Sequence, residues 1–217
     1  MEFKVFDLGL IDFQQALSLQ KQIHLKVKEG LLEGALIICS HYPVMTAGRR
    51  AKKESLLVPR KELKERGVSL CQVERGGDIT YHGPGQLTAY PIFNLGLVKK
   101  DIHLFLRELE EVVISFLMDL GIAAERRYGL TGVWIGNKKI ASIGISIKNW
   151  ITFHGLTINI KSNDLENFRL IKPCGMDIEM TSVEDILGAD LEIADLKEEL
   201  ILAFKKVFCR SRQLIAV

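Results

Sequence analysis

Along much of the chain, hydrophobic residues recur every three to four positions, a spacing typical of amphipathic helices. The first predicted helix begins at Asp12, which forms a capping box with Gln15, and ends at Gly30. The strongest stripe lies between Asp101 and Gly121; its members are Ile102, Phe105, Leu106, Leu109, Val112, Val113, Phe116, Leu117 and Leu120. Further helical patterns occur at residues 59–67, near Asp164, at 182–187 and at 194–208.

In the middle of the chain the hydrophobic period changes to two, which indicates β-strands. Ile143, Ile145 and Ile147 alternate with small or polar residues within 139–148, and this strand is predicted to form a hairpin with 133–135. Other predicted strands cover residues 35–39, 69–74, 86–93 and 151–160. Strands clustered mid-chain, with helices at both ends and one between them, predict an α+β fold with a mostly antiparallel sheet.

Composition narrows the class of protein. The 217 residues are 47% hydrophobic, and no linker or repeat divides them, so we expect a single domain over residues 1–217. The 29 basic and 27 acidic residues leave a net charge of +2, which argues against a nucleic-acid partner. Charges interrupt the N-terminus and no stretch approaches 18 apolar residues, so we expect no membrane partner and a cytoplasmic location.

Charge is distributed unevenly along the chain. Residues 49–66 contain eight basic and three acidic residues, a net charge of +5. Residues 177–199 contain nine acidic residues and one lysine, a net charge of −8. Two interpretations stay open: both segments are ordinary solvated helical faces, or the basic one receives an acidic protein partner.

The segment at residues 75–86 holds four glycines, a composition that bends the backbone tightly and lets a ligand approach closely. The phosphate-loop motif GxxxxGK[ST] and the dinucleotide motif GxGxxG are both missing from the chain. HExxH and paired metal-ligand spacings are missing too, and the four cysteines form no CxxC pair. We therefore expect neither a metal nor a cofactor, but composition alone leaves the ligand open.

Four segments together resemble one family. Residues 75–95, RGGDITYHGPGQLTAYPIFNL, resemble the signature of the lipoyl/octanoyl transferases, the octanoyl-[acyl carrier protein]:protein N-octanoyltransferases of lipoate biosynthesis. The other pieces follow in the expected order: HYPVMTAGR at 41–49, KIASIG at 139–144, and FHGLTIN at 153–159 leading to KPCG at 172–175. The resemblance spans roughly residues 5–187. After KPCG, where the family usually reads YAGMEMT, this chain has MDIEMT, which is one residue shorter.

The resemblance implies a fold and a reaction. The fold is that of the biotin and lipoate protein ligase catalytic domains, a mixed sheet flanked by helices. The reaction is transfer of an octanoyl group from an acyl carrier protein thioester to a lysine of lipoyl domains, through a cysteine acyl-enzyme. The acceptors implied are the E2 subunits of 2-oxoacid dehydrogenases and the glycine cleavage H protein. No ATP is needed, because a thioester is already an activated acyl donor.

The resemblance also implies site residues. It makes Cys174 the nucleophile and Lys139 the cation that lowers the pKa of its thiol. Without the resemblance, Cys174 would be interpreted as a small buried hydrophobe and Lys139 as a solvated hairpin lysine. The acyl chain and its carbonyl are expected along Arg75, Gly76, Gly77, Asp78, Ile79, Thr80, Tyr81, His82, Ser142, Ile143, Gly144, Gly155, Leu156 and Thr157.

The five histidines are given different roles. His82, between the glycines, is expected to brace the loop or to line the substrate site, with a direct bond to the substrate carbonyl as the alternative. His154 is interpreted as a surrounding residue of the site. His24, His41 and His103 are interpreted as structural.

Two other enzyme classes and a binding module compete with this interpretation. An ATP-dependent lipoate- or biotin-type protein ligase shares the fold but would carry a different glycine-rich loop and would not need the Pro-Cys-Gly nucleophile. A lipoyl-domain amidotransferase also uses cysteine, but the joint motifs fit it less well. A non-catalytic module that binds acyl carriers or lipoyl domains could dispense with Cys174 and Lys139, so their joint presence argues against it.

Overall fold

The computed structural model describes residues 1–172 and 177–209. Its main feature is a seven-stranded sheet with the order β1-β2-β6-β10-β9-β8-β7. Among these strands β1 and β2 run parallel, and the other neighbours are antiparallel. The predicted α+β fold with a mostly antiparallel sheet is therefore confirmed. The strands are β1 (Lys4–Ile11), β2 (Gly34–His41), β6 (Gln86–Phe93), β10 (Ile151–Asn159), β9 (Lys138–Lys148), β8 (Leu130–Ile135) and β7 (Glu125–Arg127).

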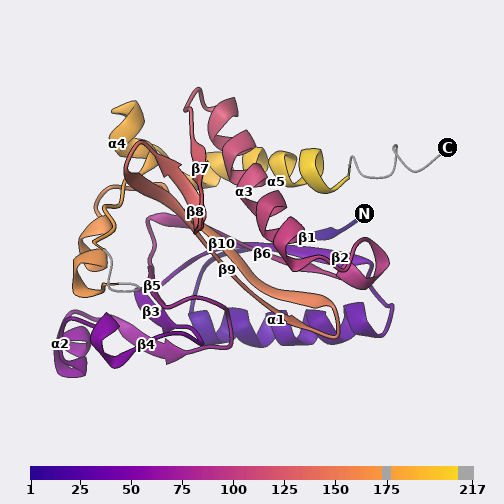
Figure 1. Ribbon diagram of the computed structural model, residues 1–217, viewed down its shortest axis with the longest axis horizontal. Helices are drawn as coiled ribbons and strands as arrows, with labels where there is room; N and C mark the ends of the chain where they lie inside the picture. The colour runs from indigo at the N-terminus through magenta and orange to yellow at the C-terminus, as the bar shows by residue number, and fades with distance from the viewer. Residues whose placement is uncertain (173–176, 210–217) are drawn as a thin grey trace.

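Helices cover both faces of this sheet (Figure 1). Helices α3 (Ile102–Asp119) and α5 (Ile193–Phe208) pack on one face, and α1 (Phe13–Lys28) packs on the other. Strand β2 is consequently buried on both sides: Ile38 joins the core under α3 and α5, whereas Ile37 joins the core over α1. No helix in the described part of the chain is long and apolar enough to cross a membrane.

The two helix starts predicted from aspartates are confirmed. The Asp12 carboxylate accepts hydrogen bonds from the backbone N–H groups of Gln14 at 2.8 Å and Gln15 at 3.1 Å. The Asp101 carboxylate accepts one from Leu104 N–H at 2.9 Å. Each cap satisfies donors that the first helical turn leaves without a partner. These local bonds explain why both starts could be read from the sequence.

A second, three-stranded sheet has the order β4-β3-β5 and lies beside the large one. Strand β3 (Val44–Ala47) pairs in parallel with β4 (Ser69–Gln72) and antiparallel with β5 (Ile79–His82). Helix α2 (Arg60–Glu65) and the 3-10 helix η3 (Leu165–Leu170) complete a small core around β3 and β5. The remaining short helices are η1 (Lys53–Ser55), η2 (Leu95–Leu97) and α4 (Val183–Leu187).

Four strands were not predicted from the sequence. Strands β1 and β7 are the two edges of the large sheet, and many of their side chains are exposed, so their hydrophobic alternation is weak. Strand β3 is only four residues long, and β5 lies inside the segment that we expected to be a glycine-rich turn. Pairing between these two, with Tyr81 opposite Met45, forms both strands. The helical pattern near Asp164 is the 3-10 helix η3.

The core under α3 predicts a large mutational effect. Leu109 is fully buried between α3 and the sheet, so Leu109→Ala should lower the free energy of unfolding by about 2–5 kcal/mol through lost burial and the cavity left behind. Leu97 is 77% exposed, and Leu97→Ala is the matched control, with an expected change below about 0.5 kcal/mol. Chemical denaturation of both variants checks this, and equal losses would contradict the packing described.

Candidate functional site

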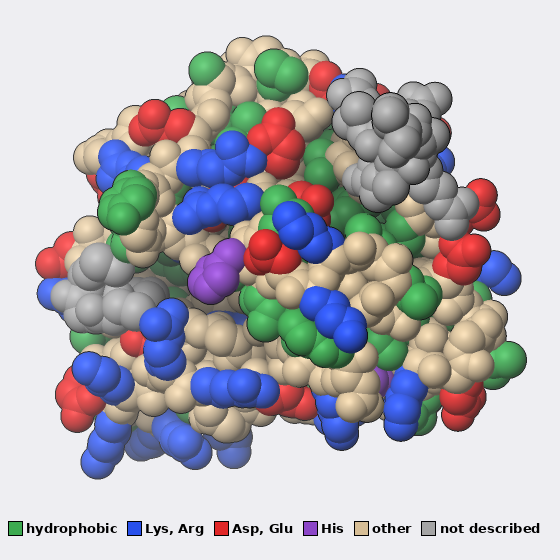
Figure 2. Space-filling view, turned by 45° about the vertical axis from the view of Figure 1, so that its right-hand side comes forward, with side chains coloured by type: hydrophobic (Ala, Val, Ile, Leu, Met, Phe, Trp, Pro, Cys, Tyr) green, Lys and Arg blue, Asp and Glu red, His purple; other side chains and the backbone are tan. Residues whose placement is uncertain are grey.

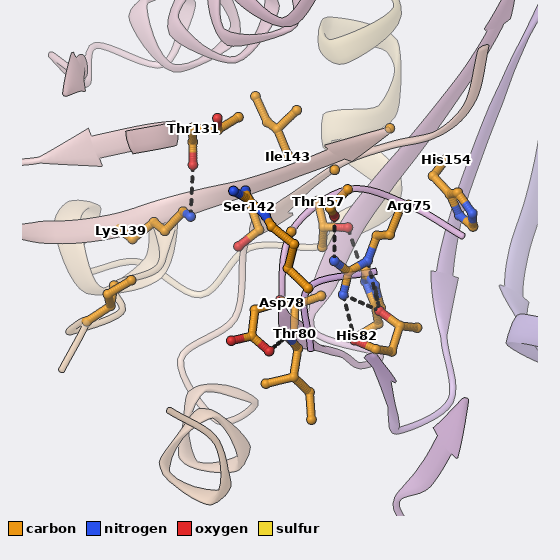
Figure 3. Close-up of a pocket in the computed structure, with 18 of the residues that line it drawn as sticks. Arg75, Asp78, Thr80, His82, Thr131, Lys139, Ser142, Ile143, His154 and Thr157 are labelled. Atoms are coloured by element: carbon orange, nitrogen blue, oxygen red, sulfur yellow. Dashed lines mark hydrogen bonds between the residues drawn. The ribbon is translucent and has the colours of Figure 1, made fainter. Parts of the chain in front are cut away.

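A cavity of about 300 Å³ lies between the glycine-rich segment and strands β9 and β10 (Figure 3). The two walls are tied together by a hydrogen bond from Gly76 N–H to the Ile145 carbonyl at 2.8 Å. Segments far apart in the sequence supply the lining, so that the cavity exists only in the folded chain. Its residues are Phe13, Thr46, Arg50, Arg75, Gly76, Gly77, Asp78, Ile79, Thr80, His82, Tyr90, Gly129, Leu130, Thr131, Trp134, Lys139, Ser142, Ile143, Gly144, His154, Gly155, Thr157, Ile178 and Met180.

Arg75 places a buried cation in the cavity wall. Its Nη2 donates to the Thr46 carbonyl at 2.5 Å and to Thr46 Oγ1 at 2.9 Å, and its Nη1 donates to the Gly76 carbonyl at 3.0 Å. A side chain at Gly144 would come within 3.0 Å of Arg75 Cδ, so glycine is what leaves room for the arginine there. Burial lowers the pKa of Arg75 to about 10, and the guanidinium therefore stays charged at neutral pH.

His82 is held between two hydroxyl groups. Its Nδ1 lies 3.2 Å from Thr157 Oγ1 and its Nε2 lies 3.4 Å from Thr46 Oγ1, while its ring stacks on Phe13 with centroids 5.9 Å apart. Burial, with added repulsion from His41 and Arg75, holds the pKa of His82 well below its usual 6.5. The ring is thus neutral at physiological pH, and its contacts link β5 to Thr46 on β3 and to Thr157 on β10.

Lys139 projects its ammonium into the cavity from β9 (Figure 3). Its Nζ donates to the Thr131 carbonyl at 3.0 Å and lies 5.4 Å from the centroid of the Trp134 ring. Lys138, one position earlier on the strand, forms an ion pair with Glu179 at 2.9 Å and does not line the cavity. Successive strand side chains point to opposite faces, which explains why the two lysines differ.

Cys174 lies outside the described residues, but the chain on both sides of it is anchored. On the C-terminal side, Lys139 N–H donates to the Glu179 carbonyl at 2.8 Å, and Thr181 N–H donates to the Lys139 carbonyl at 3.0 Å. Ile178 and Met180, from the same segment, line the cavity.

On the N-terminal side, Lys172 N–H donates to the Ser55 carbonyl at 2.8 Å. The Ser55 hydroxyl in turn donates to the carboxylate of Asp78, a cavity residue, at 2.7 Å. An ion pair of 2.9 Å joins Lys172 to Asp177 across the segment 173–176. Both flanks of the candidate nucleophile are therefore attached to residues at or next to the cavity.

Most of the side chains expected from the sequence meet in this cavity, and two do not. Tyr81 points into the small core, where its hydroxyl donates to Asp164 at 3.0 Å. Leu156 belongs to the core under α3 and is 1% exposed. Each lies between cavity residues on its strand and so faces away. The residues that line the cavity as expected are Lys139, Arg75, Gly76, Gly77, Asp78, Ile79, Thr80, His82, Ser142, Ile143, Gly144, Gly155 and Thr157.

Several lining residues were not singled out from the sequence. Thr46 lies within the HYPVMTAGR segment, so that motif could have indicated it. Trp134 and Thr131 come from the hairpin, where alternation was the available signal. His154, which the sequence indicates as a surrounding residue of the site, lines the cavity and has a left-handed backbone (φ 57°). Burial lowers its pKa to about 4, and its Nε2 has no hydrogen-bond partner within the described residues.

The neutral state of His82 predicts how stability depends on pH. Its pKa is lower in the folded chain than in the unfolded chain, so the unfolded chain binds the extra proton as the pH falls below 6.5. His82 should therefore lower the free energy of unfolding as the pH falls from 7 to 5. Denaturation at both pH values should show a smaller loss in His82→Gln than in the wild type. His103 is exposed, and His103→Gln should retain the wild-type loss; identical losses in all three proteins would refute the assignment.

The chain is similar in sequence to a known domain family and to known enzymes. The family model described as "Lipoyl protein ligase A/B catalytic domain" matches residues 12–205. An octanoyltransferase of Caldicellulosiruptor saccharolyticus is 45% identical over 213 residues, which cover 96% of this chain and 89% of the relative. An octanoyltransferase of a Thermoanaerobacter species is 43% identical over 207 residues, covering 94% of this chain and 90% of the relative.

Solved structures share the fold at low sequence identity. A lipoate-protein ligase A bound with ATP matches with a TM-score of 0.77 and 19% identity, over 95% of this chain and 85% of that one. The ligase of a Thermoplasma acidophilum lipoylation system, studied with its E2 lipoyl domain, matches with a TM-score of 0.74 and 20% identity, over 95% of this chain and 84% of that one. A biotin protein ligase from Aquifex aeolicus matches with a TM-score of 0.56 and 13% identity, over 94% of this chain and 69% of that one. The expected likeness to biotin and lipoate protein ligase catalytic domains is thereby confirmed.

Proposed function

Because the chain belongs to the lipoyl protein ligase A/B catalytic domain family, we propose that Cys174 carries the acyl group as a thioester between two protein substrates. The chain is an acyltransferase that moves an octanoyl group in protein lipoylation. We propose that the donor is octanoyl-acyl carrier protein, and that lipoyl domains of 2-oxoacid dehydrogenase E2 subunits and the glycine cleavage H protein are the acceptors. The reaction is proposed to take place in the cytoplasm.

The position of Lys139 is the observation that carries this proposal. Its ammonium lines the cavity, and its own backbone is hydrogen-bonded to residues 179–181, which follow Cys174 closely in the chain. A cysteine thiol with an ordinary pKa near 8.5 is only a few per cent ionised at neutral pH. A neighbouring ammonium favours the thiolate, and each unit by which it lowers the thiol pKa corresponds to about 1.4 kcal/mol.

The proposed reaction has two steps. In the first, the Cys174 thiolate attacks the carbonyl carbon of the octanoyl thioester, and the bond to the pantetheine sulfur breaks. The Lys139 ammonium gives its proton to that sulfur, so the pantetheine leaves as a thiol and Lys139 is left as a neutral amine. In the second, the neutral amine of the acceptor lysine attacks the octanoyl-cysteine, and the Cys174 sulfur leaves as a thiolate. Lys139 takes up the proton that the amine loses.

The cavity provides an apolar surface for the acyl chain. Ile79, Leu130, Ile143 and Met180 contribute hydrophobic side chains, and Trp134 adds an aromatic one. Burial of about six methylenes would contribute roughly 5 kcal/mol of binding free energy. That amount favours octanoyl over short chains but discriminates weakly against a chain one carbon longer or shorter.

The competing enzyme classes fit less well. The chain is 45% and 43% identical to the two octanoyltransferases but 19% identical to the ATP-bound ligase, a level at which only the fold is shared. A lipoyl-domain amidotransferase would use the same cysteine with a different donor. The donor that acylates Cys174 therefore separates this class from the proposed one.

Incubation with octanoyl-acyl carrier protein should add one octanoyl group to the intact protein. The label should be removed by hydroxylamine, because it is a thioester, and Cys174→Ser should not acquire it. Intact-protein mass spectrometry followed by peptide mapping measures this. Cys71→Ser and Cys209→Ser are the matched controls and should be labelled like the wild type. Labelling at another cysteine would contradict the proposal. So would labelling by an octanoylated lipoyl domain without any labelling by octanoyl-acyl carrier protein.

The basic strip, defined as the exposed basic side chains within residues 49–66, is proposed to receive the acidic carrier. Figure 2 shows Lys and Arg side chains gathered at the lower left of its face, the end of the molecule that holds α2 in Figure 1. Arg50 also lines the cavity, which places one end of the strip at the site. The members are Arg49, Arg50, Lys52, Lys53, Arg60, Lys61, Lys64 and Arg66.

Charge reversal tests the basic strip. Lys52→Glu with Lys53→Glu should raise the KM for the carrier about tenfold at low salt, since steering by opposite charges weakens, and the effect should shrink as salt screens it. Lys26→Glu with Lys28→Glu, exposed at the end of α1, is the control and should leave KM unchanged. If Lys52→Glu with Lys53→Glu leaves the KM unchanged at low salt, the basic strip is an ordinary solvated surface.

A further inference from the structure

Glu110 is a buried carboxylate on a face of α3 that is otherwise apolar. It is 1% exposed, and the other buried residues of the helix are Phe105, Leu109, Val112, Val113, Phe116 and Leu117. A carboxylate is costly to bury unless its oxygens are paired or hydrogen-bonded. Its retention on a core face therefore needs a reason.

Each carboxylate oxygen of Glu110 has partners. Oε2 accepts a hydrogen bond from Arg107 Nη1 at 2.6 Å and lies 3.3 Å from Arg126 Nε. Oε1 accepts a hydrogen bond from the backbone N–H of Gly132 at 3.1 Å. Glu110 thus joins α3 to the hairpin of β7 and β8 through the guanidinium group of Arg126 and the peptide group of Gly132, whereas Arg107 belongs to α3 itself.

The peptide unit that Glu110 contacts is the one that contacts Lys139. The Thr131 carbonyl and the Gly132 N–H belong to the same planar peptide unit and point in opposite directions. Glu110 lies at the N–H end, and the Lys139 ammonium donates to the carbonyl end at 3.0 Å (Figure 3). The negative carboxylate faces the positive end of the peptide dipole, and the positive ammonium faces its negative end, so both contacts are favourable.

Gly132 is shaped for this arrangement. Its backbone has a φ of 130°, and a Cβ there would lie 2.5 Å from Lys139 Cε and 2.7 Å from the Ala141 carbonyl oxygen. A side chain at this position would displace the lysine from the hairpin. The absent side chain lets the lysine stem lie directly against the peptide unit that Glu110 orients.

Other charged groups surround the same site. Arg127 lies on the Trp134 ring, 4.8 Å from its centroid, and Trp134 is also the ring next to Lys139. Lys138 is paired with Glu179. Among the residues that the structure describes, the other charged side chains lining the cavity are Arg50, Arg75 and Asp78. Glu110 differs from all of these because it reaches the ammonium through a single peptide unit.

We propose that Glu110 is a positioning residue for the transfer reaction: its carboxylate orients the Thr131–Gly132 peptide unit, whose carbonyl holds the Lys139 ammonium at the cavity wall. This inference rests on the role proposed above for Lys139. The charge of Glu110 favours the protonated lysine, and the protonated lysine favours the Cys174 thiolate. Removal of that charge should therefore make the thiol harder to ionise.

The test is the pH midpoint of Cys174 alkylation by iodoacetamide in a Cys71→Ser, Cys209→Ser background. Cys39 is buried, and burial raises the pKa of its thiol, so it reacts slowly. Glu110→Gln keeps an oxygen to accept from Gly132 N–H but loses the charge, and it should raise the midpoint by about half a pH unit. Glu111→Gln is the matched control: Glu111 pairs with Arg126 at 2.5 Å but is half-exposed, and its replacement should leave the midpoint unchanged.

Three further outcomes make the test decisive. If Lys139→Ala raises the midpoint while Glu110→Gln behaves like Glu111→Gln, the inference about Glu110 is wrong and the proposed function stands. If Lys139→Ala leaves the midpoint unchanged, the proposed lysine–cysteine pair itself fails. If Glu110→Gln proves unfolded by circular dichroism, Glu110→Asp decides, because it keeps the charge on a shorter side chain. An alkylation midpoint closer to that of the wild type than the midpoint of Lys139→Ala is, together with a reduced kcat, supports positioning. An unchanged kcat overturns it.

Discussion

The backbone pairing of Lys139 with residues 179–181 is the constraint on which the site depends. It attaches the segment that precedes α4 to strand β9 of the large sheet, and it fixes which lysine of the Lys138-Lys139 pair faces the cavity. A shift of one residue would exchange the two, because side chains alternate along a strand. The ion pair between Lys138 and Glu179 on the other face supports the same register.

Polar groups around the cavity form a hydrogen-bond network. Arg75 and His82 both bond to Thr46, and His82 also contacts Thr157, so that a buried cation and a neutral imidazole share one network. Buried polar groups are costly unless they are satisfied, and a satisfied network is rigid. The rigidity holds these polar groups in place in the cavity wall. Burial also makes the folded state sensitive to acid, because it lowers the pKa of His82 and His154 and holds both rings neutral.

Much of the fold was predictable because its signals are local. The caps of α1 and α3 depend on residues two or three positions away, and the alternation of Ile143, Ile145 and Ile147 lies within one strand. Strand β5 was missed because its strand conformation depends on pairing with β3, more than thirty positions earlier. The resemblance implied the whole segment 75–82 as site residues and so included Tyr81, yet its side chain occupies the opposite face of the strand.

The sequence by itself determined the family resemblance, the mostly antiparallel fold and most of the cavity residues, because motif order and hydrophobic period are properties of the chain. The tertiary structure decided which side of each strand faces the cavity and that Thr46, Trp134 and Thr131 join it. It also brought Glu110 and Lys139 to the two ends of one peptide unit. Such contacts join residues distant in sequence, and only packing of the helix against the hairpin creates them.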